Sequence, residues 1–273
     1  MILTYTVRDA EQWAAFSGDY NPIHFDLERA RALGGDDLSV HGMRALLDMK
    51  QYLSAALLQA SPQAEFYMFS ARLRQPLMCH KSYQMSLTGQ PDGTKVRGTL
   101  VDEQSDSVCF SAKLTAAAPL TIAPADNVLV YSSDDLRTLS HRFPLPAQEP
   151  ARLWSFLDAV LFQRIVEAPD TMRMVKEVFP QLRANALIDV FGRVPVVQTH
   201  HDVHFNACLF SPDADFHAGS GMHCAIQPTL VTGSGESGFV LSIVIQAWSD
   251  EQPLLSTAVT LKTLPAQVNS YQQ

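Results

Sequence analysis

A long apolar helix followed by a run of short strands occurs twice in this chain, and this order constrains the fold more than any other feature. Residues 40–58 place apolar side chains at helical spacing, and residues 65–115 then alternate between apolar and polar positions, interrupted by turn signals. Residues 152–168 read as a second apolar helix, and strand-like runs follow between 196 and 264. The halves therefore repeat an architecture without evident sequence identity.

This repeat predicts an α+β fold in which each long helix packs on an antiparallel sheet. A single sheet of this kind leaves open edges, so we expect the two sheets to join edge to edge. We place the first unit at residues 1–120 and the second at 126–273. The small, proline-bearing segment 116–126 is typical of a linker.

Charge and composition exclude several classes of function. The chain has 28 acidic against 20 basic residues, a net charge of −8, which argues against a nucleic-acid partner. It has no signal-peptide pattern and no apolar run long enough to span a bilayer, so we expect a cytoplasmic protein without membrane insertion. We interpret its scattered cysteines as free thiols that act as small buried hydrophobic residues: Cys79, Cys109, Cys208 and Cys224.

The segment FSGDYNPIHFD, residues 16–26, concentrates the chemistry of the first half. Its glycine and proline interrupt regular structure, so a turn presents Asp19, Asn21 and His24 together. A neutral imidazole and a carboxylate that share one water can divide the proton transfers of an addition or elimination. The Asn21 amide can orient either group without titrating. An Asx-turn with a buried structural histidine is the alternative interpretation of these residues.

Gly42 stands where the first long helix begins. A glycine there lets a ligand oxygen approach unpaired backbone amides, which the helix dipole makes favourable for negative charge. We therefore expect an oxyanion site at Gly42, with His41 and Met43 beside it on the substrate side. The ordinary interpretations are that His41 is a helix-entry residue and that Met43 belongs to the core.

SGDYNPIHFD followed by VHGM resembles the signature of the MaoC-like family, which contains (R)-specific enoyl-thioester hydratases and 3-hydroxyacyl-thioester dehydratases. The resemblance covers about residues 16–43. It implies a hot-dog fold, in which a sheet wraps a long helix, and reversible hydration of trans-2-enoyl thioesters. It also implies that Asp19 and His24 form the catalytic pair, and that the Gly42 amide faces the thioester oxygen.

The second half lacks this signature. The resemblance therefore implies a double hot-dog with one active site per chain, in which the second unit closes the sheet and lines the acyl tunnel. It implies no cofactor and no metal. The substrate would be a thioester of coenzyme A or of an acyl carrier protein, and the acidic composition disfavours the latter unless a local basic patch exists. A homodimer is compatible with this interpretation.

Two other functions remain open at this point: an acyl-thioester hydrolase, and a non-catalytic acyl-binding or scaffold subunit. The GGDDLS segment, residues 34–39, departs from the family pattern at Asp36 and Asp37. THHDVHF suggests a metal site, but a strand points His201 away from His200 and His204, so we expect none there.

Overall fold

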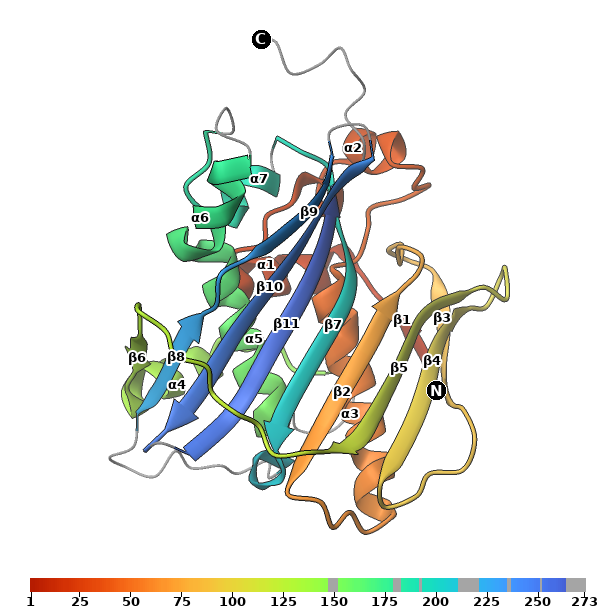
Figure 1. Cartoon of the computed structure of the whole chain (residues 1–273). Coiled ribbons are helices and arrows are strands. Elements are labelled where there is room, and N and C mark those ends of the chain that lie inside the picture. Colours follow the sequence, from red (N-terminus) through yellow and green to blue (C-terminus); the bar gives the residue numbers. More distant parts are fainter. Residues whose placement is uncertain are drawn as a thin grey trace.

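The structure is a computed structural model that describes residues 1–146, 152–178, 183–191, 193–210, 221–234, 237–250 and 252–263. A single large antiparallel sheet forms one layer, and the long helices cover one of its faces (Figure 1). None of the helices in the described ranges combines the length and the hydropathy that a bilayer crossing requires.

The first half of the chain carries a short strand, a helical region with the motif of residues 16–26, a long helix and four further strands. The last three of these strands form a meander, and the first pairs with the last. These elements are β1 (Ile2–Thr4), α1 (Val7–Ser17), η1 (Pro22–His24), α2 (Leu27–Ala32), α3 (Gly42–Gln59), β2 (Phe66–Leu73), β3 (Ser82–Leu87), β4 (Lys95–Asp102) and β5 (Val108–Ala117).

The second half repeats this order with additional short helices. Its elements are β6 (Leu129–Tyr131), α4 (Ser133–Ser140), α5 (Leu153–Glu167), α6 (Pro169–Val178), α7 (Leu187–Phe191), β7 (Val196–Asn206), η2 (Ala207–Phe210), β8 (Met222–Ile226), β9 (Leu230–Ser234), β10 (Gly238–Ser249) and β11 (Gln252–Thr263).

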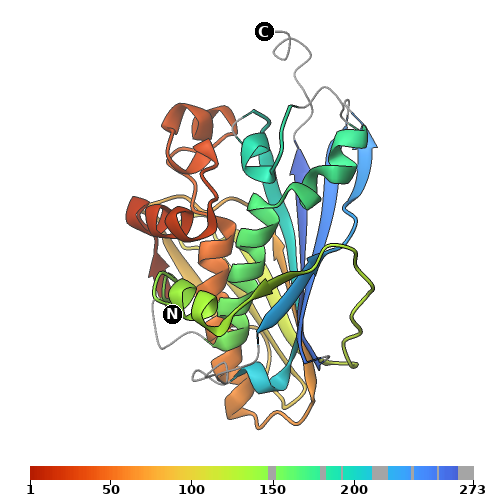
Figure 2. The same cartoon turned by 90° about the vertical axis from the view of Figure 1, so that its left-hand side faces the viewer.

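The two halves share one sheet, as the repeat predicts. The strand order is β1-β3-β4-β5-β2-β7-β11-β10-β8-β6, with β9 paired to β10. The junction is the antiparallel pair of β2 and β7, whose register runs from Phe66 opposite Asn206 to Arg72 opposite His200. Helices α3 and α5 lie side by side against this sheet (Figure 2). The topology is a double hot-dog.

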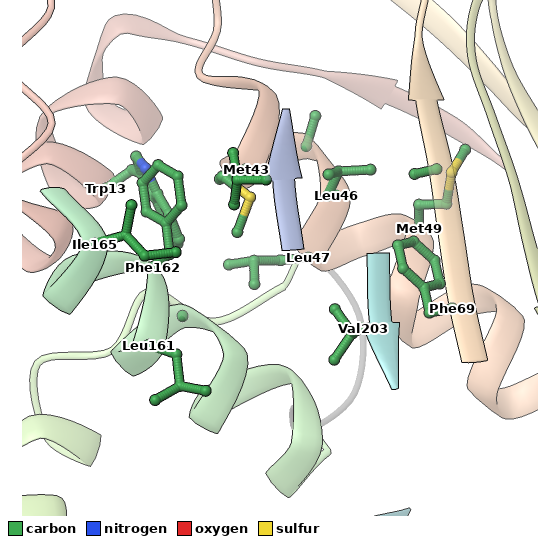
Figure 3. Close-up of a cluster of buried hydrophobic side chains, with 14 of the residues drawn as sticks. Trp13, Met43, Leu46, Leu47, Met49, Phe69, Leu161, Phe162, Ile165 and Val203 are labelled. Carbon is green, nitrogen blue, oxygen red and sulfur yellow. The ribbon is translucent and has the colours of Figure 1, made fainter. Parts of the chain in front are cut away.

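Apolar side chains from both helices and from the central strands fill the space between the layers. Figure 3 shows part of this core, which includes Leu46 and Leu47 of α3, Leu161 of α5, and Phe69 and Val203 of the junction strands. All five side chains are fully buried. Burying such side chains stabilises the fold by about 1.5–3 kcal/mol each before chain entropy is counted.

The long helices begin and end within two residues of their predicted bounds. Sequence periodicity missed α4, α6, α7 and β9. β9 pairs antiparallel with β10 from Gly238 opposite Ser234, and residues 235 and 236 between these strands lie outside the described ranges. All four cysteines are free thiols, but Cys208 is exposed and not buried, because it lies in the short η2 at the end of β7.

Candidate active site

The turn that presents the motif begins where α1 ends. Gly18 caps α1 in the left-handed conformation, with φ of 74°, and its amide donates to the carbonyl of Ala14. The chain then reverses, and the Asp19 amide donates to Ser17 Oγ at 3.2 Å. Asp19 Oδ1 in turn accepts from the Asn21 amide at 3.2 Å. Only glycine adopts this φ without steric cost, so Gly18 sets the position of Asp19.

Asn21 fastens the turn to the second half of the chain. Its Oδ1 accepts from the Ile23 amide at 3.4 Å, and its Nδ2 donates to the Val196 carbonyl at 3.4 Å. Val196 is the first residue of β7. Both polar ends of this amide therefore have backbone partners, so the side chain fixes the motif against β7 while it lines the cavity described below.

His24 has a defined tautomer. Its Nδ1 lies 2.7 Å from the Ser39 carbonyl oxygen. A carbonyl only accepts hydrogen bonds, so Nδ1 carries the proton and Nε2 keeps its lone pair. The residue is buried, with 5% of its surface exposed. His24 therefore offers the lone pair of Nε2, and the hydrogen bond at Nδ1 fixes the orientation of the ring.

His41 lies behind His24 and supports it. The two rings stack with centroids 3.5 Å apart and planes inclined by 25°. His41 Nε2 donates to the carbonyl oxygen of Asp19 at 2.8 Å. The residue is 1% exposed and does not line the cavity, and its Nδ1 has no hydrogen-bond partner among the described residues. His41 thus contacts both members of the predicted pair.

Burial shifts the pKa values of the two predicted catalytic groups in opposite directions. It raises the pKa of Asp19 to about 7, a shift that the hydrogen bond from the Asn21 amide only partly offsets. It lowers the pKa of His24 to about 4 against the effect of the Ser39 carbonyl. Near neutrality His24 is uncharged, and much of Asp19 is protonated. Two neighbouring groups whose pKa values are shifted in opposite directions can serve as the acid and the base of one reaction.

Gly42 occupies a confined position at the N-terminus of α3. A Cβ added there would lie 2.5 Å from Leu73 Cδ2 and 3.4 Å from Gln198 Oε1. A side chain at this position therefore requires Leu73 to move. The first amides of α3 have no intrahelical partners, and Gly42 and Met43 of this first turn line the cavity described below.

A cavity of about 280 Å³ joins these parts, and it has residues from both halves in its wall. Asp19, Asn21, His24, Gly42 and Met43 line it from the first half. Apolar side chains make most of the remaining wall, among them Leu73, Leu77, Phe110, Phe162, Phe191, Val196 and Leu261. The volume lies near the lower end of the range for small-molecule sites, about 300–1,000 Å³.

Gln198 of β7 is a wall residue that the sequence did not single out. Its Nε2 contacts Met43 Sδ at 3.5 Å and His201 Nδ1 at 3.3 Å. His201 Nε2 lies 3.0 Å from Asp158 Oδ2, so that nitrogen carries the proton and Nδ1 accepts from Gln198. The amide nitrogen of Gln198 consequently faces the protein, and its oxygen faces Gly42.

A buried ionic cluster holds His201 in place. Lys50 of α3 pairs with Asp158 of α5, and both side chains are fully buried. Thr257 of β11 donates to Asp158 Oδ1 at 2.7 Å. Although burial opposes ionisation, His201 and Lys50 hold the pKa of Asp158 below its ordinary value. Burial also lowers the pKa of Lys50, against the attraction of Asp158.

The remaining predicted positions lie away from the cavity. Asp36 pairs with Lys81 at 2.7 Å and Asp37 with His80 at 3.1 Å, on the surface. His200 and His204 face the outer side of β7, where His200 Nδ1 contacts Thr199 Oγ1 and His204 Nε2 donates to the Ala118 carbonyl. These two histidines and the inward His201 do not converge. In the described residues the potential ligand atoms of Asp19, His24 and His41 do lie within 4.8 Å of one another.

Comparisons with known proteins concern the fold. No family model matches the chain, and no curated protein matches it. Solved structures that match include a MaoC-like dehydratase, with 12% identity, a TM-score of 0.46 and coverage of 96% of this chain and 95% of that one. A putative oleoyl thioesterase from Lactobacillus plantarum has 8% identity, a TM-score of 0.49 and coverage of 97% and 95%.

A third match is a Mycobacterium tuberculosis protein described as having a double hotdog fold, with 12% identity, a TM-score of 0.45 and coverage of 97% and 94%. This chain is a double hot-dog protein by its own topology: two long helices against one joined antiparallel sheet. The matched structures include a dehydratase and a thioesterase, so the likeness does not distinguish between these reactions.

Proposed function

We propose that this chain is a hydratase/dehydratase that interconverts trans-2-enoyl and (3R)-3-hydroxyacyl thioesters. The observation that carries the proposal is the buried pair of Asp19 and His24. These groups have oppositely shifted pKa values and face an apolar cavity beside the N-terminus of α3. An elimination needs both an acid and a base within reach of adjacent carbons, and this pair supplies them.

In the active state Asp19 is protonated and His24 is neutral, so the pair carries one transferable proton. In dehydration, His24 Nε2 takes the proton from the α-carbon, and the protonated Asp19 carboxyl gives its proton to the departing hydroxyl as the C–O bond breaks. The products are the enoyl thioester, water, an imidazolium and a carboxylate. Hydration runs through the same charge-separated pair in reverse: Asp19 takes a proton from the attacking water, and His24 returns one to the α-carbon.

The N-terminus of α3 supports the same chemistry. Loss of the α-proton leaves negative charge on the thioester oxygen as an enolate. The amides near Gly42 and the positive end of the helix dipole favour that charge. Leu73 leaves no room for a side chain at Gly42 unless it moves, so the backbone of α3 stays bare at this position. The substrate's acyl chain would contact the apolar wall that both halves supply.

The two halves have different parts in this proposal. We infer that residues 1–120 form the catalytic unit and that residues 126–273 form a unit that closes the sheet and the cavity. β5 ends at Ala117 and β6 begins at Leu129, which agrees with this division. The second unit supplies Phe162, Phe191 and Gln198 to the cavity wall.

A substrate screen tests the proposal and separates it from thioester hydrolysis. The purified protein is mixed with trans-2-enoyl-CoA of several chain lengths. Loss of enoyl absorbance measures hydration, and a thiol reagent measures released CoA. We expect absorbance to fall without release of thiol. Stoichiometric thiol release would identify a hydrolase, and binding without either change would identify an acyl-binding subunit.

A further inference from the structure

The outer face of the sheet carries a second hollow, of about 520 Å³, over strands β4, β5, β2 and β7. Figure 1 views the sheet from this side, and the helices lie behind it. Four cationic side chains line the hollow: Arg72, Arg74, Arg97 and Lys113. All four are exposed. We call this set the outer basic patch.

The register of the strands brings these charges together. Arg97 of β4 stands directly opposite Lys113 of β5, and Arg72 of β2 stands opposite Ser111, two residues before Lys113 on β5. Like charges directly opposite each other on one sheet face destabilise the pairing. No residue of the outer basic patch makes an ion pair within the described ranges. Among the residues that the structure describes, Asp202 is the one acidic residue in the wall of the hollow.

This concentration of positive charge contrasts with the whole chain, whose net charge is −8. The side chains near the patch supply further hydrogen-bond donors, because Ser70, Thr99 and Ser111 also line the hollow. Arginine with hydroxyl groups is a donor set suited to phosphate oxygens. The local charge therefore favours a multiply phosphorylated anion.

The outer basic patch continues into the candidate active site. Arg74 lines both the outer hollow and the inner cavity, and Leu73, the last residue of β2, lines the inner cavity. β2 thus presents Arg72 to the outer face and Leu73 to the cavity, and the chain just beyond its end borders both spaces. A molecule with a slender arm can leave the inner cavity at Arg74 and place its head group on the outer face.

We propose that the outer basic patch binds the phosphates of coenzyme A when the thioester occupies the inner cavity. This inference rests on the proposed function, which requires a thioester carrier. The nucleotide end of coenzyme A bears a diphosphate and a 3′-phosphate. A carrier protein of the usual acidic kind offers a single phosphate on its arm, and the overall negative charge of this chain repels its body.

The kinetic test uses the double variant Arg97→Ala/Lys113→Ala, because these two side chains line the outer hollow and not the inner cavity. KM for enoyl-CoA should rise roughly tenfold or more, the scale expected for lost charge-assisted hydrogen bonds, with kcat nearly unchanged. KM for the matching enoyl-pantetheine, which has no phosphates, should not change. The matched control is Lys262→Ala on β11, an exposed cation outside the hollow, and both KM values should stay at the wild-type level.

Three outcomes overturn the inference. One is an unchanged KM for enoyl-CoA in the double variant. Another is an equal rise of KM for both thioesters, which indicates damage to the cavity. The third is a rise of KM in the double variant for enoyl thioesters of an acyl carrier protein but not for enoyl-CoA.

A binding measurement keeps this inference separable from the proposed reaction. Calorimetry with adenosine 3′,5′-bisphosphate needs no turnover. The wild-type protein should bind this probe, more weakly as salt increases, and the double variant should lose most of the affinity. If neither thioester is hydrated but the probe binds as described, the reaction fails and the phosphate site stands. Equal affinity of both proteins for the probe contradicts the phosphate site.

Discussion

The Nδ1 atom of His24 lies 2.7 Å from the carbonyl oxygen of Ser39, which directs the lone pair of the other ring nitrogen toward the cavity that Asp19 also lines. This contact defines the tautomer, and burial determines the charge. Together they make His24 a neutral base beside a carboxyl group that holds its proton near neutrality. The first two predictions follow from these protonation states.

The pH dependence of kcat/KM should be bell-shaped, because it reports the ionisation of the free enzyme. Activity should fall below about pH 4, where His24 becomes protonated, and above about pH 7, where Asp19 loses its proton. Steady-state rates of enoyl-CoA hydration across the range in which the protein stays folded provide the measurement. A kcat/KM that increases steadily above neutrality would contradict these assignments.

The same shifts predict how stability depends on pH. Asp19 has a raised pKa in the folded state, so its contribution is lost as pH rises from about 4 to about 7. His24 has a lowered pKa, so its contribution is lost as pH falls from 6.5 to about 4. The two slopes have opposite signs and nearly cancel in the wild-type protein between these limits.

Substitution should reveal each slope. Relative to the wild type, the free energy of unfolding of Asp19→Asn should increase with pH by about 1.4 kcal/mol per unit between about pH 4.5 and 6.5. The free energy of unfolding of His24→Gln, relative to the wild type, should decrease with pH at a similar rate. Urea unfolding at several pH values gives these differences. Parallel curves for both variants and the wild type would show that the pKa values are not shifted by folding.

The buried pair of Lys50 and Asp158 predicts a large loss of stability when one partner is removed. Lys50→Met leaves the Asp158 carboxylate in the core without the Lys50 ammonium group, at a cost of about 3–5 kcal/mol. The matched control is Lys81→Met, which breaks the exposed pair with Asp36 and should cost less than about 1 kcal/mol. Denaturant unfolding compares them, and equal losses would contradict the account of the cluster.

The confined position of Gly42 predicts a defect with a specific rescue. Gly42→Ala should lower kcat and raise KM, since the new methyl group collides with Leu73 Cδ2 and crowds the thioester oxygen. The double variant Gly42→Ala/Leu73→Ala removes the collision inside the protein. Its KM should fall part of the way back toward the wild-type value, whereas Leu73→Ala alone should not improve activity. Wild-type kinetics for Gly42→Ala would show that no oxygen binds there.

The sequence predicts those parts of the molecule that depend on local patterns. Apolar periodicity identifies α3 and α5, and the turn chemistry around Gly18 and Pro22 identifies the motif. The repeat predicts the joined sheet. In each case neighbouring residues carry the signal, so one sequence is enough.

The parts that sequence analysis missed depend on contacts between distant segments. Asp158 pairs with a lysine 108 positions away, and Gln198 contacts Met43 across 155 positions. Two weak signals pointed to the cluster: Asp158 is the one acidic residue in the interior of an apolar helix, and His201 faces the core side of its strand. Predicting the outer basic patch requires knowledge of the strand register, because its cations come from three separate strands or strand ends.

The central claim is that Asp19 and His24 act as one acid and base pair, and kinetics of Asp19→Asn test it most directly. Asn keeps the shape of the side chain but carries no transferable proton. With folding verified by circular dichroism, kcat for enoyl-CoA hydration should fall by roughly 10²–10⁴, with KM nearly unchanged. The kcat of His24→Ala should fall by a similar factor, and the kcat of the double variant should be little lower than that of either single variant. A folded Asp19→Asn protein that hydrates enoyl-CoA at the wild-type rate would contradict the claim and leave the motif a structural turn.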